Sequence, residues 1–214
     1  MKMRILAFFL FLPFAFILPQ GIGQLAPDKP AEVFPDNALG LDIMFSEGGF
    51  GLGTFYRRQL SQTFTLFSDF SVSESKDENE FEYVDYYGNT YTVGKKNRVF
   101  LLPLNFGMQY RLFSDVIYDN LRPYINGGVG PALVLTTPYE EEFFSAFGRA
   151  QAHYAFGSYI GFGANFGLDK SSLIGINLRY YMIHFFNEGV ESLAGRYKKD
   201  LGGFYLTINI GMMY

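Results

Sequence analysis

The chain has 214 residues, a formal net charge of −4, 49% hydrophobic residues and no cysteine. So small a charge gives no reason to expect nucleic acid as a partner, and the missing cysteine excludes disulfides, thiolate metal sites and lipid attachment through a cysteine. The length suits one domain, and no stretch beyond residue 23 is apolar over the roughly 20 residues that a membrane-spanning helix needs.

The first 23 residues are typical of a secretory signal peptide. A positively charged start is followed by the apolar run 5–18, and Gly21 and Gly23 are small residues before a cleavage site at Gln24. The apolar run is too short for a spanning helix. We therefore predict that residues 1–23 are removed and that residues 24–37 form a short periplasmic leader.

Eight later segments have the pattern of β-strands. The clearest is the last, because every second residue from Phe204 to Tyr214 is large and apolar, which is typical of a strand with one face in an apolar medium. The predicted strands are residues 38–46, 50–59, 63–74, 98–113, 121–135, 153–168, 172–186 and 201–214. We predict an all-β domain over residues 38–214, an eight-stranded antiparallel up-and-down transmembrane β-barrel.

The predicted connections differ in length at the two ends of the barrel. Short turns alternate with long connections over residues 75–97, 136–152 and 187–200, and only the first hairpin, around Gly48, departs from this alternation. Membrane barrels have short periplasmic turns and long extracellular loops. Both chain termini are therefore expected on the periplasmic side.

The two faces of the predicted strands differ in chemistry. In 153–168 one face carries Phe156 and Phe162, and the other carries Gly157 and Asn165. Large apolar residues facing outward into lipid explain this pattern, whereas a soluble lipocalin-like barrel would have an apolar interior and a polar exterior.

The final strand, which ends on Tyr214, and residues 122–130, Arg-Pro-Tyr-Ile-Asn-Gly-Gly-Val-Gly, resemble a known family. They are similar to the small eight-stranded barrels of the OmpA and OmpX type, the outer membrane protein beta-barrel domain. The resemblance covers the whole mature chain and implies a protein of the Gram-negative cell envelope, located in the outer membrane. No counterpart of the peptidoglycan-binding domain of full OmpA follows Tyr214, so anchoring to the cell wall is not expected.

The predicted interior carries charges of both signs. In so narrow a barrel we expect them to pair and fill the space, which favours a closed polar lumen; the alternative is a narrow porin-like channel for ions or small solutes. The charged residues predicted to face inward are Asp42, Asp69, Arg57, Arg111, Arg122 and Arg179.

Enzymatic activity is not expected. The two histidines are His153 and His184, and they fall on opposite faces of the predicted barrel wall. Outer-membrane acyl hydrolases place a serine two residues after the histidine, where this chain has Ala155 and Phe186. The sequence therefore predicts no catalytic residue, no metal site and no cofactor.

Residues 75–97 carry the best indication of function. Tyr83, Tyr86, Tyr87 and Tyr91 surround a predicted turn at Gly88-Asn89, so the neighbouring strands are expected to continue as a raised hairpin. Such an edge binds partners by strand addition or aromatic contact. The alternative is a solvated acidic loop that keeps lipopolysaccharide at a distance.

These observations favour a structural or surface-interaction role in the outer membrane. The expected partners are outer-membrane lipid and lipopolysaccharide, together with a protein partner at the extracellular loops, and the chain is expected to be a monomer. A third possibility, besides the channel, is a component of a secretion or surface-export machine.

Overall fold

The computed structural model describes residues 34–77, 79–88, 90–114, 116–117, 121–167 and 170–214. The predicted signal peptide, residues 1–23, and most of the predicted leader lie outside the described residues. No helix in the described ranges is long and apolar enough to cross a membrane.

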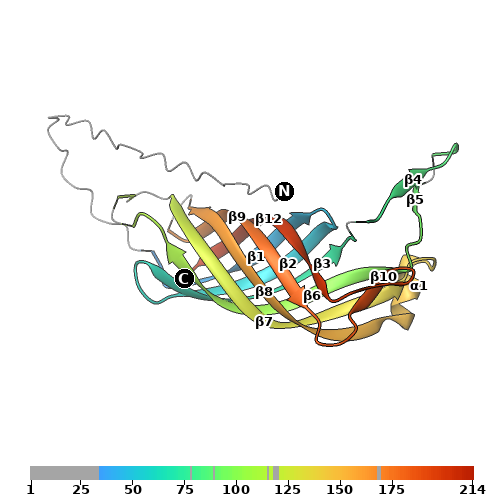
Figure 1. The fold of residues 1–214 in the computed structure, drawn as a ribbon. Coiled ribbons are helices and arrows are strands. Elements are labelled where there is room, and N and C mark those ends of the chain that lie inside the picture. The colour runs from blue at the N-terminus through green and yellow to red at the C-terminus, as the bar shows by residue number, and fades with distance from the viewer. Residues whose placement is uncertain (1–33, 78, 89, 115, 118–120, 168–169) are drawn as a thin grey trace, which may run out of the picture. The chain divides into compact units, whose positions relative to one another are not determined.

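The described chain forms a closed antiparallel barrel (Figure 1). Each strand of the wall pairs with the strand next along the wall in sequence, and the last closes on the first. The predicted fold is therefore confirmed, and the predicted strand ends differ from the observed ones by at most three residues. The strands of the wall are β1 (Asn37–Ser46), β2 (Gly49–Gln59), β3 (Phe64–Ser75), β6 (Asn97–Arg111), β7 (Arg122–Pro138), β8 (Gln151–Phe166), β9 (Ser172–His184) and β12 (Asp200–Met213).

The seam between β1 and β12 fixes the register of the barrel. Asp42 pairs with Asn209 across it, and Asn37 and Tyr214 exchange two backbone hydrogen bonds of 3.1 and 2.9 Å. Because a slip of one residue would turn every apolar side chain inward, the alternating sequence permits one register.

The barrel has two unlike ends. We call the end that carries Asn37 and Met213 the terminal end, and the opposite end, with the long connections, the loop end. Figure 1 shows the C-terminus at the opposite end of the barrel from α1 and β10. The small elements of the connections are β4 (Glu82–Val84), β5 (Thr90–Thr92), α1 (Phe143–Ala146), η1 (Phe147–Arg149), β10 (Val190–Leu193) and β11 (Arg196–Lys198).

The predicted hairpin in residues 75–97 exists but differs in detail. Val84 pairs with Thr90, so residues 85–89 connect the strands, and the expected two-residue turn at Gly88-Asn89 is wrong. β4 and β5 also form a sheet of their own instead of prolonging β3 and β6. The hairpin therefore begins after the barrel wall has ended.

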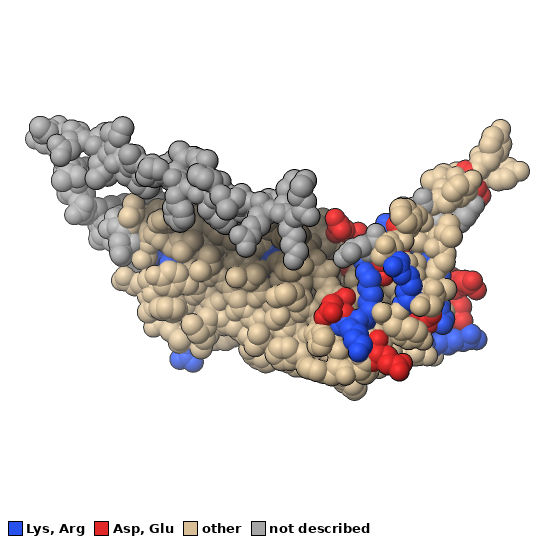
Figure 2. All heavy atoms as spheres, in the orientation of Figure 1, with Lys and Arg blue, Asp and Glu red and all other residues tan. Residues whose placement is uncertain are grey.

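The outer face of the wall is apolar. Leu41, Ile160 and Phe204 are each more than 60% exposed, and such side chains alternate with buried ones along every strand. On the face that Figure 2 shows, charged side chains gather at the loop end and the rest of the wall is almost free of them. A continuous apolar band is what a lipid bilayer requires of the outer face of a barrel.

Candidate functional site

The six charged residues predicted to face inward form two separate groups. Asp42, Asp69 and Arg179 meet in the middle of the barrel, in what we call the central network. The remaining three, Arg57, Arg111 and Arg122, line a pocket at the terminal end.

Arg179 is the centre of the central network. Its side chain is buried, and its Nη2 donates to Oδ2 of Asp42 at 3.0 Å. Its Nη1 lies 3.6 Å from Oδ2 of Asp69 and donates to the Tyr181 hydroxyl at 3.2 Å. The guanidinium also lies 5.2 Å from the centre of the Tyr159 ring. One cation thus joins two carboxylates from different parts of the wall.

Neutral side chains satisfy the remaining oxygens of the two carboxylates. Asn209 donates to Oδ1 of Asp42. Asp69 accepts from Nδ2 of Asn105 at 2.8 Å and from the Tyr159 hydroxyl at 2.9 Å. Buried charges are tolerated when they are paired and hydrogen-bonded in this way, so the central network fills the barrel where a soluble protein has its apolar core.

Inward glycines make room for the inward tyrosines. A Cβ placed on Gly163 would lie 2.9 Å from Cζ of Tyr124, and one on Gly128 would lie 3.2 Å from the ring of Tyr159. At these two positions the missing side chain leaves the space that the tyrosine rings occupy.

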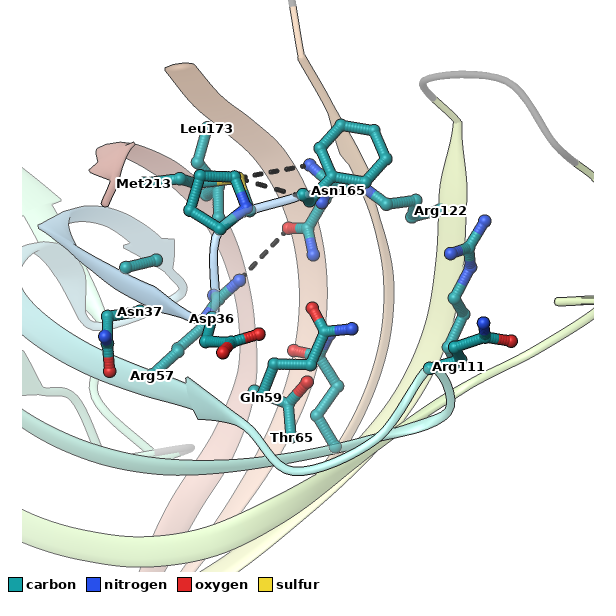
Figure 3. A pocket seen from close by; sticks show the side chains of 15 residues that line it. Asp36, Asn37, Arg57, Gln59, Thr65, Arg111, Arg122, Asn165, Leu173 and Met213 are labelled. Atoms are coloured by element: carbon teal, nitrogen blue, oxygen red, sulfur yellow. Dashed lines mark hydrogen bonds between the residues drawn. The ribbon is translucent and has the colours of Figure 1, made fainter. Parts of the chain in front are cut away.

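The pocket at the terminal end is small and polar. It has a volume of about 50 Å³, and Figure 3 shows Arg57, Arg111 and Arg122 around it. Arg57 donates to Oδ1 of Asn165 at 3.1 Å, and Arg111 donates to the carbonyl oxygen of Ile117 at 2.9 Å. None of the contacts described for these arginines joins them to Asp42 or Asp69, so they lie apart from the central network.

Phe34, in the leader, closes the terminal end. It is buried together with Ala38, Phe55, Leu173 and Met213. The Arg122 guanidinium stacks on its ring at 4.0 Å from the centre. Sequence reasoning missed this residue because it precedes the first strand, although a lone phenylalanine beside Pro35 was a usable signal.

At the loop end the interior is apolar, which the sequence reasoning did not foresee. The inward positions there carry large aliphatic and aromatic side chains that are almost fully buried, and β10 adds another one. The polar inward face therefore occupies only part of the barrel. The buried residues of this apolar cap are Val99, Leu101, Ala132, Val134, Ala155, Ile183, Phe185 and Val190.

Ion pairs join two of the long connections over the apolar cap. The buried Glu80 accepts from Nζ of Lys95 at 2.9 Å and from Oγ of Ser192 at 3.0 Å. Nζ of Lys198 lies 3.2 Å from Oδ1 of Asp77. Asp77 and Glu80 are both buried, so the alternative of a solvated acidic loop is wrong for these two residues.

The pKa of Asp77 reflects this setting. Burial alone would raise the pKa of Asp77, but hydrogen bonds from the backbone and side chain of Asn79, together with Lys198, lower it below its usual range. Asp77 is therefore held in its charged form where the two connections meet.

The hairpin of β4 and β5 exposes the predicted aromatic residues. Tyr86 is 98% exposed and Tyr87 is 86% exposed, and their rings lie 5.8 Å apart. Tyr83 is also exposed, and it pairs through its backbone with Tyr91, about whose side chain nothing is described. The tyrosines share this hairpin, and the rings that are described are accessible.

The two histidines lie apart, and each contacts a different polar side chain. Nε2 of His153 is 3.2 Å from Oγ1 of Thr136 inside the wall, whereas the half-exposed His184 pairs with Asp200 at 2.6 Å. Among the described residues, no group of three histidine, aspartate or glutamate side chains is arranged to hold a metal ion.

No protein-family model matches the sequence, and no curated protein matches it. Among solved structures, the chain is similar to neisserial surface protein A, with 10% identity and a TM-score of 0.55 over 86% of this chain and 100% of that one. It is also similar to the N-terminal β-barrel domain of OprF from Pseudomonas aeruginosa, with 12% identity and a TM-score of 0.47 over 84% of this chain and 98% of that one. The attachment invasion locus protein Ail of Yersinia pestis matches with 11% identity and a TM-score of 0.41, over 82% and 95% of the two chains. The likeness to the neisserial protein confirms the eight-stranded barrel fold.

Proposed function

We propose that this chain is an outer-membrane β-barrel with a closed interior, and that it acts through the surface of its loop end. The observation that carries the proposal is the inversion of the usual burial pattern. Apolar side chains cover the outside of the wall, while charged ones meet in the middle. A closed barrel with this pattern suits a bilayer, and the predicted signal peptide supports export to the outer membrane.

Three layers of side chains support a closed interior. Phe34 and its neighbours fill the terminal end, the central network fills the middle, and the apolar cap fills the loop end. An eight-stranded barrel is narrow enough for side chains to fill it. The interior is polar in its middle layer and at the terminal pocket, so it acts as a folding core and not as a path for solutes.

Because the interior is closed, the loop end is the part of the barrel that can make contacts outside the cell. The hairpin of β4 and β5 offers the exposed Tyr83 on its sheet and the exposed Tyr86 and Tyr87 on its turn. Tyrosine supplies large contact area and a hydroxyl at small entropic cost, which suits a protein partner. The mixed charges at this end of the wall suit the phosphates and counterions of lipopolysaccharide (Figure 2).

Single-channel recording in a planar bilayer tests the closed interior. We expect inserted protein to be silent, because three layers of packed side chains lie across the interior. Insertion is checked on liposomes of the same lipid by protection of the wall from protease. A stable and reproducible conductance from inserted protein would contradict the proposal and favour a narrow channel.

A further inference from the structure

A hollow interrupts the outer face of the wall between β2, β3 and β6. Its centre is Ser68, which lies in register between Tyr56 and Phe106. The next outward residues along β3 are Leu66 and Phe70, so one small side chain stands among large ones. The hollow has a volume of about 470 Å³, and Tyr56, Leu66, Phe106, Met108 and Arg58 line it around Ser68.

Arg58 stands at the side of this hollow that faces the terminal end. It pairs with Asn37 at the start of β1 and is exposed. At the terminal end, Arg58 is the one charged residue among the outward-facing residues of the described strands. Its guanidinium forms no ion pair with described residues. An arginine at the edge of an apolar band extends to the membrane interface, where the phosphate of a lipid headgroup is an anionic partner within reach.

We infer that this hollow binds one phospholipid of the periplasm-facing leaflet, with its phosphate on Arg58 and an acyl chain over Ser68. The inference rests on the proposed placement in the outer membrane. The guanidinium matches phosphate in charge and in bidentate geometry. An acyl chain gives the walls of the hollow the dispersion contacts that a rigid neighbour cannot.

The chain offers matched controls for a test. Arg58→Gln removes the charge and Ser68→Leu fills the hollow. Lys170→Gln removes an exposed cation from a turn at the same end. Ser158→Leu adds the same side chain at another half-buried outward serine, which lies between Val129 and Met182 on β8.

Native mass spectrometry of the purified protein, titrated with phosphatidylglycerol in detergent, measures the binding. We expect one phospholipid to bind first, with about tenfold weaker affinity in Arg58→Gln and a similar loss in Ser68→Leu. Lys170→Gln and Ser158→Leu should bind as the parent protein does. Dioleoylglycerol, which lacks phosphate, should bind as weakly to the parent protein as phosphatidylglycerol does to Arg58→Gln.

Several results would overturn the inference. Equal binding of phosphatidylglycerol by all variants would show that the hollow is not a phospholipid site. Equal binding of dioleoylglycerol and phosphatidylglycerol by the parent protein would show the same. A dimer that Ser68→Leu abolishes, with phospholipid binding unchanged, would assign the hollow to a second copy of the chain. Failure of the protein to enter liposomes would contradict the proposed membrane location instead, so the two failures are distinguishable.

Discussion

Arg179 shows how much one residue contributes to a barrel of this kind. Its guanidinium neutralises Asp42 and Asp69 together. Replacing it by methionine leaves two buried carboxylates without a cation, and breaking a buried pair typically costs about 3–5 kcal/mol. We expect Arg179→Met to lower the free energy of unfolding by that amount, as measured by urea titration followed by circular dichroism.

The control for Arg179→Met is Arg196→Met, at an exposed arginine in β11. Exposed charges contribute little to stability, so this variant should unfold at nearly the parent urea concentration. Equal unfolding of both variants would show that the central network does not stabilise the barrel.

Gly163 offers a second test at the scale of one residue. A methyl group there would press on the backbone oxygen of Ile176 and lie 2.9 Å from Tyr124. Overpacking of this kind costs roughly 1–3 kcal/mol, so Gly163→Ala should be destabilised by that amount in the same urea titration. Gly157→Ala is the matched control on the same strand, because its nearest neighbour would be 3.6 Å away; equal loss in both would contradict the steric reason.

The sequence predicted which residues face inward but not which of them meet. Alternation with period two places Asp42, Asp69 and Arg179 on the inner face, because a strand allows no other choice. The pairing of Asp42 with Arg179 joins residues 137 positions apart. Barrel closure and strand register bring these two residues together, and no local sequence pattern contains either. The sequence therefore could not assign Arg57 to the terminal pocket instead of the central network.

At the scale of elements, the hairpin of β4 and β5 is separable from the barrel. Its strands pair only with each other among the described strands. We expect a deletion of residues 82–92 to leave the heat-dependent gel shift of the folded barrel unchanged, while contact with any protein partner at this surface is lost.

A deletion of 80–92 is the informative comparison, because it also removes the buried Glu80 and its bonds to Lys95 and Ser192. Loss of folding in the shorter deletion would show that the hairpin belongs to the barrel core.

The joint between the long connections should weaken in acid. The pKa of Asp77 is below its usual value, so its contribution to stability is complete above the ordinary aspartate pKa of about 4 and is lost as the pH falls through the lowered pKa. We expect the parent protein to melt at a higher temperature than Asp77→Asn at pH 7, and this difference to vanish on acidification below about pH 4.

Glu140→Gln is the control for this acid effect, since Glu140 is an exposed carboxylate in another connection. Its melting temperature should equal that of the parent protein at every pH. A difference between the parent protein and Asp77→Asn that stays constant down to pH 2 would show that the charge of Asp77 does not hold the joint.

Connections were harder to predict than strands for a physical reason. The wall strands are long, and each repeats the same alternation, so their ends were placed closely. β10 and β11 are short and irregular, with a register shift between Glu191 and Leu193, and their burial depends on the apolar cap beneath them. A short segment that is stabilised by tertiary packing has little pattern of its own.

At the scale of the whole molecule, the closed barrel was predicted from three features together: an even number of alternating segments, as barrels of this type have, apolar outward faces, and the resemblance of the final strand. The layered interior was not predictable in the same way. Val134 and Ile183 face inward at the loop end, where the wall is covered by β10. In the sequence, an apolar residue on the inner face is only an exception to the polar pattern of that face. Its place in the apolar cap can be recognised only once the position of the connection that covers it is known.

Because the chain has no tryptophan, a single introduced tryptophan can report whether the outer face of the wall contacts lipid or water. Ile176 faces outward between Ala164 and Ile208, so the fluorescence of Ile176→Trp in liposomes should be strongly quenched by brominated acyl chains and hardly by iodide. Tyr86→Trp, on the exposed hairpin, should show the reverse. If iodide quenches the fluorescence of Ile176→Trp as strongly as that of Tyr86→Trp, the apolar wall faces water. The outer-membrane location would then be wrong, even though the barrel fold stands.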